Sequence, residues 1–403
     1  MVNRDSRRPL RIAIAAPFAI HPKGTTLWRV LPLARALAEA GHAVRVVIPP
    51  YDWPCHGGTR WWMDGVDVFN VPVPGRLDPS GIQQVTRQIT RSVMQWQPDL
   101  VHLFKPKGFG GITAALLAVR TSVPWVMDAD DWEAGWNQRM SYPAIWRRFF
   151  AWQERWGLRS AGAVTAASHW LVGFARGLRG GSDGVLYLPN RVSPQIASNS
   201  HSHNAMARQH APAMTAGGRP PRVLLFTRFV EHTPDLVWRV WRRVLAEQPA
   251  AELLVGGAGS SGEQQQLLAL ARKHGAESSI RLLGWVPASS LPGLFGAVDA
   301  GLLPVIDQPL NRAKSPMRLL DLLAAGVPVA TNGVGEYGRF VNESDGGLVV
   351  APADWQGLAN GVLRLLGEVD LRRRLRSQGI QWSQRNGWPK AVPELEELYW
   401  QLC

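Results

Sequence analysis

Residues 11–48, RIAIAAPFAIHPKGTTLWRVLPLARALAEAGHAVRVVI, decide the fold. Apolar runs of strand length stand at both ends of this stretch. Between them, apolar residues repeat with helical period at Leu27, Val30, Leu31, Ala34 and Leu37. Gly41 is placed to end the helix, and unbroken apolar runs are typical of strands that are buried on both faces. The stretch therefore predicts a strand, a helix and a second strand parallel to the first.

The same alternation continues to about residue 190 and later starts again. Residues 193–221 are rich in Ser, His, Asn, Gly and Pro and lack apolar periodicity, which is typical of a linker. From residue 222 the opening pattern recurs as RVLLFT, a helical segment and AELLVGGAG. We therefore predict an α/β protein with two Rossmann-like, doubly wound domains, at residues 1–192 and 222–380. Residues 381–403 are expected to form a C-terminal helix that packs back on the first domain.

Composition excludes several classes of protein. The 403 residues are 46% hydrophobic, which suits two folded cores and does not suit a disordered chain. Cys55 and Cys403, the two cysteines, give neither a disulfide framework nor a metal-ligand spacing. No apolar run reaches the length of a membrane-spanning helix. A cytoplasmic protein without a metal is expected.

The formal net charge of +13 comes mainly from arginine and suits an anionic partner. The sequence contains no recognisable nucleic-acid-binding module, so specific binding to DNA or RNA is not expected. Residues 142–159, YPAIWRRFFAWQERWGLR, mix Trp and Arg as a membrane-interfacial helix does. The alternative is a helix that covers the core with its Trp side chains inward. We favour this alternative because Gln153 and Glu154 interrupt the basic face, and peripheral contact with an anionic membrane at the inner face stays the competing hypothesis.

A second informative stretch is residues 311–335, NRAKSPMRLLDLLAAGVPVATNGVG. Ser315 suits the N-cap of a short helix, with Pro316 at the first helical position, and Gly326 suits its left-handed end. Apolar residues share one face of this predicted helix. Lys314, Arg318 and Asp321 fall on another side, with Lys314 just ahead of the first turn.

The chemistry of this polar side suits a nucleotide. A helix N-terminus with two cations attracts a diphosphate, and a carboxylate one turn further on can accept hydrogen bonds from two neighbouring ribose hydroxyls. Taken alone, the residues fit a surface ion pair between Arg318 and Asp321 equally well.

Several motifs in order resemble the family 4 glycosyltransferases of the GT-B fold. In the second half these are TRFVEHTPDL, AELLVGGAG, RLLGWVPASSLPGLFGAVDAGLLP and NRAKSPMRLLDLLAAGVPVA. In the first half the likeness rests on Gly24, Arg29, Leu33, Ala34, Leu37, Gly41 and His42. The resemblance covers nearly the whole chain. It implies two domains that face each other across a cleft, and transfer of a sugar from a nucleotide donor with retention of configuration, without a metal or another cofactor.

The resemblance also implies roles for individual residues. Arg228 would reach the donor diphosphate and Asp321 would hold the ribose. Further donor contacts are expected from Arg318, Asn311, Glu231, Gly257, Trp285, Val286, Ser315 and Gly335. Arg228, Lys314 and Asp130 are predicted to be catalytic, the first two by stabilising the leaving group. On the acceptor side we expect Gly24, Thr25, Asp128 and Asp131.

Two departures from the family pattern concern the donor site. The acidic residue that contacts the donor sugar is replaced by Ala313, and the family lysine is replaced by Thr233. Lys314 is a candidate to restore the missing positive charge. A subfamily with a rearranged donor site is the preferred interpretation. The alternative is a non-catalytic sugar-nucleotide-binding or scaffold protein with a degenerate site.

The segment DADDWE, residues 128–133, forms an acidic cluster where the family often has a histidine. Asp128 and Asp130 make an Asp-x-Asp pattern, but the predicted fold is metal-independent, so we expect no metal there. Contact of Asp130 or Asp131 with an acceptor hydroxyl is preferred, and capping of a helix by one of these residues is the alternative. Lys105 and Lys107, in the loop FKPKGFGG, fit either a contact with an acceptor phosphate or a simple turn.

The sequence thus predicts a retaining glycosyltransferase. Its partners would be a nucleotide sugar and an acceptor of unknown type, which is a glycan, a lipid-linked molecule or a protein.

Overall fold

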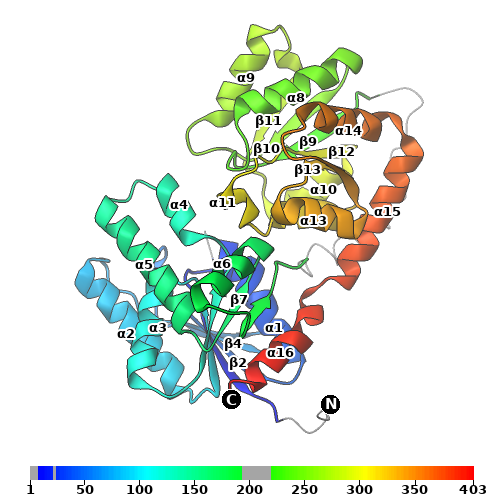
Figure 1. The fold of residues 1–403 in the computed structure, drawn as a ribbon. Coiled ribbons are helices and arrows are strands. Elements are labelled where there is room, and N and C mark those ends of the chain that lie inside the picture. Colours follow the sequence, from blue (N-terminus) through cyan, green and yellow to red (C-terminus); the bar gives the residue numbers. More distant parts are fainter. Residues whose placement is uncertain (1–7, 21–23, 193–218) are drawn as a thin grey trace. The chain divides into compact units, whose positions relative to one another are not determined.

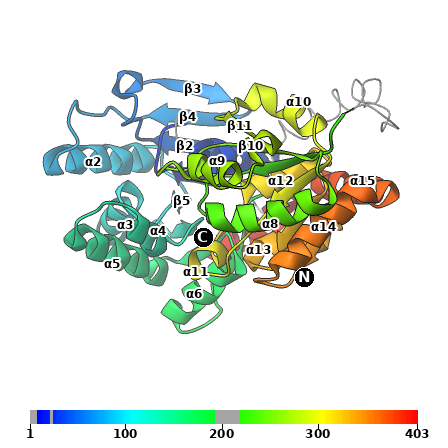
Figure 2. The ribbon, with the colours of Figure 1, turned by 90° about the horizontal axis from the view of Figure 1, so that it is seen from above.

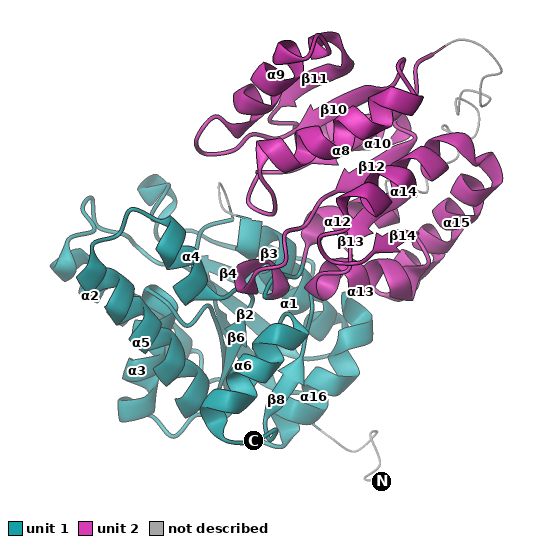
Figure 3. Ribbon diagram, turned by 45° about the horizontal axis from the view of Figure 1, so that its top comes forward, with its two compact units in different colours: residues 1–190, 313–315, 388–403 teal, residues 191–312, 316–387 magenta. Residues whose placement is uncertain are grey.

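The computed structural model describes residues 8–20, 24–192 and 219–403 (Figure 1). The chain forms two compact units (Figure 3). Unit 1 comprises residues 1–190, 313–315 and 388–403, and unit 2 comprises residues 191–312 and 316–387. Most of the predicted linker lies outside the described residues. The return of the chain to unit 1 begins at Trp388, seven residues later than the boundary expected from the sequence.

Unit 1 contains an eight-stranded sheet of order β3-β4-β2-β1-β5-β6-β7-β8. Its strands are β1 (Arg11–Ala15), β2 (Ala43–Ile48), β3 (Arg60–Met63), β4 (Val66–Asn70), β5 (Leu100–Phe104), β6 (Trp125–Ala129), β7 (Ala163–Ala166) and β8 (Val185–Tyr187). All neighbours pair in parallel except β3, which is antiparallel to β4. β3 was not predicted, because this edge strand has only four residues, RWWM, and none of them is buried.

Helices lie on both faces of this sheet. They are α1 (Leu31–Glu39), α2 (Pro79–Gln95), α3 (Phe109–Arg120), α4 (Glu133–Arg139), α5 (Ala144–Ser160), α6 (His169–Arg179) and α16 (Val392–Trp400), with a π-helical turn at Thr26–Val30 and 3-10 turns at Pro54–His56 and Trp388–Ala391. Ile12 and Ile14 of β1 pack in one hydrophobic cluster with α1, and Ala13 and Ala15 pack in another with α2. Alternate residues of one strand therefore serve two helical layers.

Unit 2 contains a six-stranded parallel sheet of order β11-β10-β9-β12-β13-β14. Its strands are β9 (Arg222–Phe226), β10 (Glu252–Gly256), β11 (Ile280–Gly284), β12 (Ala300–Leu303), β13 (Val329–Asn332) and β14 (Gly347–Val350). Its helices are α8 (Pro234–Glu247), α9 (Glu263–Lys273), α10 (Leu291–Gly296), α11 (Pro309–Arg312), α12 (Met317–Ala324), α13 (Gly335–Ser344), α14 (Trp355–Gly367) and α15 (Val369–Arg385), with 3-10 turns at Glu277–Ser279 and Ala288–Ser290.

The sheet of unit 2 is also covered on both faces. Val223 and Leu225 of β9 pack with α8 and α14, which lie side by side (Figure 2). Leu224, between them in the strand, packs in the cluster that contains Leu319 and Leu322 of α12. The prediction of two doubly wound α/β domains is confirmed.

The C-terminal segment completes unit 1. Tyr399 on α16 is fully buried, and its hydroxyl lies 2.6 Å from Nδ1 of the buried His102 on β5. Burial lowers the pKa of His102 to about 4, so this imidazole is neutral at physiological pH.

Cys403 and Cys55 are both exposed free thiols. Among the described residues, no helix has both the length and the apolar character that crossing a bilayer requires.

Candidate active site

The connectivity of unit 2 predicts that a ligand binds at the carboxyl edge of its sheet. From β9 the chain builds β10 and β11 on one side, and then returns to add β12 on the other side of β9. Ligands of open α/β sheets bind outside the carboxyl ends of the strands where the winding direction reverses. That position falls between β9, which leads to Arg228, and β12, which leads to α11 and α12.

Asp321 is the most informative residue at this edge. It lies on α12, whose Leu319, Leu322 and Leu323 are buried, while Arg318 and Asp321 are partly exposed. Oδ1 of Asp321 is buried and has no hydrogen-bond partner among the described residues. Burial raises the pKa of Asp321 to about 7, although the nearby Arg318 acts in the opposite direction. A buried, unpartnered carboxylate oxygen is costly unless a ligand donates a hydrogen bond to it.

The guanidinium group of Arg318 lies near this carboxylate, and Arg228 lies near Arg318. Cζ of Arg318 lies 5.4 Å from the centre of the Phe226 ring. The pKa of Arg318 is lowered by burial and next by the positive charge of Arg228, while Glu231, Tyr337 and Asp321 raise it. Arg228 itself is exposed. The repulsion between two neighbouring cations would be relieved by a bound anion, and a diphosphate carries the required charge.

Glu231 and Asn311 hold the loops around these cations. The Tyr337 hydroxyl donates a hydrogen bond of 3.2 Å to Oε1 of Glu231. Asn311 Nδ2 donates to the carbonyl oxygens of Glu231, at 3.0 Å, and Ile306, at 2.8 Å. Oδ1 of Asn311 is buried without a partner among the described residues. The contact of Tyr337 with Glu231 was not predicted, because nothing in the local sequence separates Tyr337 from an ordinary buried tyrosine.

Two glycines allow the backbone to approach closely at this edge. Gly257 has φ of +105°, and a Cβ atom there would lie 2.0 Å from the carbonyl oxygen of Thr227. Gly335 has φ of +51°, and its Cβ would lie 2.9 Å from backbone atoms of Arg312. No other residue fits either position without a shift of the neighbouring chain.

Trp285 and Val286 follow β11 at the same edge of the sheet. Trp285 is 80% exposed, whereas Val286 packs against the hydrophobic cluster that contains Leu254. These two residues, Gly257 and Arg228 thus all follow the carboxyl ends of adjacent strands.

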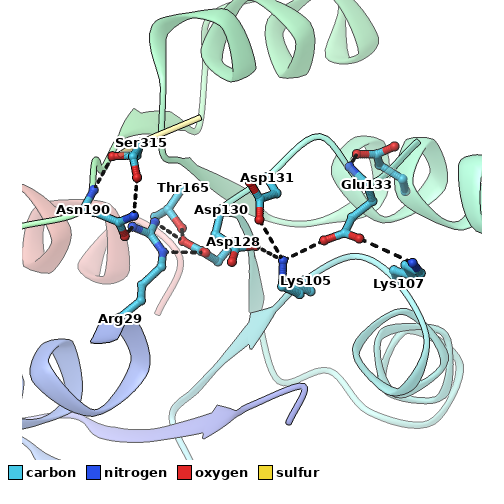
Figure 4. Close-up of polar contacts among 11 residues, drawn as sticks. Arg29, Lys105, Lys107, Asp128, Asp130, Asp131, Glu133, Thr165, Asn190 and Ser315 are labelled. Carbon is cyan, nitrogen blue, oxygen red and sulfur yellow. Dashed lines mark hydrogen bonds and ion pairs between the residues drawn. The ribbon is translucent and has the colours of Figure 1, made fainter. Parts of the chain in front are cut away.

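The expected roles of Ser315 and Lys314 need correction. The N-cap of α12 is Pro316, and no side chain caps this helix. Ser315 Oγ instead accepts a hydrogen bond of 2.9 Å from the backbone N–H of Asn190, and its carbonyl oxygen accepts one of 2.8 Å from Asn190 Nδ2 (Figure 4). Residues 313–315 belong to unit 1, where the Lys314 ammonium group lies 5.2 Å from the centre of a Trp136 ring. Lys314 is therefore not part of the helical face that carries Arg318 and Asp321.

The two departures from the family pattern have structural roles here. Thr233 is the N-cap of α8, and its Oγ1 accepts a hydrogen bond of 3.4 Å from the N–H of Leu236. Ala313 is only 1% exposed and packs in an apolar cluster with Ala166, Ala167, Leu171 and Val172. A carboxylate in place of Ala313 would be buried among these apolar side chains.

Asp128 in unit 1 is a structural residue, which corrects its expected acceptor role. It is fully buried at the end of β6. Arg29 binds it with two parallel hydrogen bonds, of 2.9 and 2.6 Å, and Thr165 Oγ1 donates a third of 2.6 Å (Figure 4). Arg29 also donates to Leu188 O and Asn190 Oδ1, at 2.9 and 3.0 Å. Both oxygens of Asp128 are occupied, so this carboxylate organises the loops behind the acidic cluster.

The other acidic residues surround Lys105. Its Nζ lies 2.9 Å from Asp130, 3.4 Å from Asp131 and 2.8 Å from Glu133 (Figure 4). Burial raises the pKa of Asp130 to about 7, with Lys105 acting against this rise and the neighbouring carboxylates adding to it. The ammonium group of Lys105 is thus already paired with carboxylates. This pairing argues against a contact of Lys105 with an acceptor phosphate. Only Asp131 keeps appreciable exposure, with 30% of its side chain accessible.

Glu154 performs the capping that was considered for Asp130 or Asp131. The N-cap of α4 is Trp132, and the Glu154 carboxylate accepts hydrogen bonds of 2.9 Å from the N–H groups of Glu133 and Ala134. No local pattern could predict this contact, because it joins two helices by tertiary packing. Gly24 and Thr25 directly precede the π-helical turn that leads into α1. Within the described ranges, no three His, Cys, Asp or Glu side chains form a group that could hold a metal ion.

Two sequence families match this chain. The family described as "Glycosyl transferase 4-like domain" matches residues 24–191, and the one described as "Glycosyl transferases group 1" matches residues 220–368. The chain belongs to the family 4 glycosyltransferases. This glycosyltransferase has the GT-B fold, since its two matched regions correspond to two doubly wound units.

Relatives of this glycosyltransferase are known. Glycogen synthase of Mycobacterium tuberculosis is 25% identical over 75% of this chain and 69% of its own length. The 2-deoxystreptamine glucosyltransferase of Streptomyces kanamyceticus is 23% identical over 84% of this chain and 89% of its own. Among solved structures, sucrose-phosphate synthase from Thermosynechococcus elongatus superposes with a TM-score of 0.70 at 18% identity, covering 98% of this chain and 99% of that one.

Proposed function

We propose that this glycosyltransferase transfers a sugar from a nucleotide-sugar donor to its acceptor with retention of configuration, without a metal. Unit 2 binds the donor and unit 1 binds the acceptor. The observation that carries the proposal is the buried, unpartnered Oδ1 of Asp321 beside Arg318. Ribose hydroxyls would satisfy this oxygen and the guanidinium groups would bind the diphosphate.

The difficult step is departure of the nucleoside diphosphate from the anomeric carbon. Negative charge then grows on the phosphate oxygens while the sugar gains positive character. In this proposal the negative charge develops next to Arg228 and Arg318, and these two neighbouring cations stabilise the transition state. Because these cations supply the charge that a metal would supply, the proposed reaction is metal-independent. Retention follows if the acceptor attacks from the face that the leaving group vacates.

On the acceptor side we propose a role for Asp131 and Asp130. Asp131 is the most exposed of the three carboxylates beside Lys105 and is suited to bind an acceptor hydroxyl. Asp130, with its raised pKa, is suited to exchange a proton near neutral pH. Gly24 and Thr25 would border the same acceptor site.

A panel of UDP, GDP, ADP and their sugars in a thermal-shift assay tests the donor site. A nucleotide present at 100 times its Kd should stabilise the protein by about 2.7 kcal/mol, and the responding base names the donor. The variant Asp321→Asn should lose most of this stabilisation, whereas Asp235→Asn, an exposed residue on α8, should keep it. If no nucleotide stabilises the protein, or if Asp321→Asn responds like the parent chain, the donor site is elsewhere.

Turnover tests the chemical part of the proposal. Arg228→Ala should lower kcat more than it weakens donor binding, because its charge acts mainly on the leaving group. Product stereochemistry, read by NMR at the anomeric position, should be that of the donor. Inversion would refute the retaining mechanism. Donor binding without transfer to any acceptor or to water would instead indicate a binding protein.

A further inference from the structure

Helix α5 carries large apolar side chains on its exposed side. The exposed fractions are 74% for Ile145, 44% for Trp146, 36% for Phe149 and 56% for Trp152. The buried positions of this helix are Gln153, Glu154, Gly157 and Leu158. The preference for inward-facing Trp side chains was therefore wrong for Trp146 and Trp152. The polar residues that were thought to interrupt an outer face are on the inner one.

This inverted orientation is fixed by hydrogen bonds. Gln153 accepts a hydrogen bond of 2.9 Å from the N–H of Gly108 and donates one of 3.2 Å to the carbonyl oxygen of the same residue. Glu154 caps the start of α4 through two hydrogen bonds of 2.9 Å. Turning the helix to bury its aromatic rings would break all four bonds and expose buried polar groups of unit 1. The orientation of α5 that exposes these rings is therefore stabilised by hydrogen bonds within unit 1.

The rings form a continuous strip. Ring centres are 5.9 Å apart for Trp146 and Phe149, 5.9 Å for Phe149 and Trp152, and 6.2 Å for Trp152 and Trp156. Trp156 is half-buried and joins the exposed rings to the core, where the buried Trp125 of β6 lies 6.1 Å from it. A contiguous exposed apolar strip marks an interaction site, whereas single exposed apolar residues do not.

Arginines accompany the strip. Arg148, Arg155 and Arg159 are spaced by seven and four residues, so they share one side of the helix, next to the side that carries Ile145, Phe149 and Trp152. The one carboxylate on the helix, Glu154, is buried. Arg148 and Arg155 are exposed and make no ion pair with any residue that the structure describes.

We propose that α5 docks this protein on the surface of an anionic lipid membrane. Helices that lie in a membrane interface place Trp and Phe at the boundary of the acyl chains and Arg at the phosphate groups. The row of arginines, without exposed carboxylates on the helix, complements an anionic surface, and the formal net charge of +13 acts in the same direction. A second copy of the chain fits less well, because a two-fold contact through this face would bring cationic rows together. The inference is independent of the proposed function.

Flotation of the full-length protein with vesicles tests the inference. Binding is expected to vesicles that contain phosphatidylglycerol and not to vesicles of phosphatidylcholine alone, and high salt should weaken it. The double variant Arg148→Gln/Arg155→Gln should bind about thirty-fold more weakly, and Phe149→Ser/Trp152→Ser should bind weakly as well. Matched controls are Arg87→Gln/Arg91→Gln on α2 and Trp62→Ser on β3, which alter exposed residues elsewhere on unit 1 and should leave binding unchanged.

Three results would overturn the inference. The first is equal binding to neutral and anionic vesicles, and the second is full binding by both α5 variants. The third is a dimer in analytical ultracentrifugation that Phe149→Ser/Trp152→Ser dissociates, because a second copy would then occupy the strip. Since all substituted side chains are exposed, the variants should keep the melting temperature of the parent, which separates lost docking from lost folding.

Discussion

Replacement of Asp321 by Asn should make this protein more stable and less able to bind its donor. Burial raises the pKa of Asp321 from 3.8 to about 7 in the folded chain. The unfolded chain ionises at the lower value, so between these two pH values the folded state holds a proton that the unfolded state has lost. The contribution of this carboxyl group to the free energy of unfolding is therefore most favourable below pH 4, and it becomes less favourable as the pH rises toward 7.

The magnitude follows from the two pKa values. With pKa values of 3.8 and about 7, the cost of burying Asp321 is about 1.7 kcal/mol at pH 5 and about 4 kcal/mol at pH 8. The side chain of Asn does not ionise, so the cost of burying it does not depend on pH. The effect of Asp321→Asn on the free energy of unfolding should therefore become more favourable by about 2.5 kcal/mol between pH 5 and pH 8. Any loss of packing or hydrogen bonding caused by the amide is the same at both pH values, so it drops out when the two measurements are subtracted.

Thermal unfolding at the two pH values is the assay. For a domain of about 150–250 residues, 1 kcal/mol shifts the melting temperature by about 2–4 °C, so the variant should gain about 5–10 °C relative to the parent on going from pH 5 to pH 8. Asp235→Asn, which removes an exposed carboxylate of unit 2, should show no such trend. If Asp321→Asn shifts the melting temperature equally at both pH values, the carboxylate is not desolvated, and the argument for a ligand that satisfies Oδ1 loses its basis.

Four further outcomes are expected. If Asp321 binds the ribose as proposed, its ionised form is the one that accepts both hydroxyls, so nucleotide affinity measured by calorimetry should rise about tenfold from pH 6 to pH 8. Gly257→Ala should cost about 2–4 kcal/mol in thermal unfolding, since its Cβ would stand 2.0 Å from a backbone oxygen. Asp128→Asn should cost about 3 kcal/mol or more, because it leaves the buried guanidinium of Arg29 without its anion, whereas a loss under 1 kcal/mol would contradict the pairing. Ala313→Asp should lower stability by roughly 3 kcal/mol at pH 8, and less at pH 5, without raising turnover.

The fold could be predicted from the sequence because the information is local. Buried parallel strands are continuous apolar runs, and the helices between them keep a 3.6-residue period. The short or half-exposed elements were missed for the same reason. β3 has only four residues, none of which is buried, and α11 consists only of Pro309–Arg312. Predicted capping at Ser315 failed because Asn190, far away in the sequence, competes for the same hydroxyl.

Site residues were less predictable, because their roles depend on partners that are distant in the sequence. DADDWE indicated an acidic cluster, but only the structure assigns Asp128 to Arg29, and Asp130 with Glu133 to Lys105. The same holds for α5, where local composition gave both candidate orientations and tertiary bonds of Gln153 and Glu154 decide between them.

The packing of this chain accounts for one departure from the family pattern, the replacement of an acidic residue by Ala313. Ala313 is buried in an apolar cluster of unit 1, so a charged side chain at this position would meet no polar partner in that cluster. In the proposed donor site, a polar contact to the sugar would therefore come from another residue. Asn311, two positions earlier, has a buried Oδ1 without a partner among the described residues, while its Nδ2 is held by two carbonyl oxygens that fix its orientation. A neutral acceptor of this kind would bind a sugar hydroxyl without adding a negative charge beside the diphosphate. We therefore propose that an oriented amide takes the place of the carboxylate in this site, which fits a changed donor preference better than a lost activity.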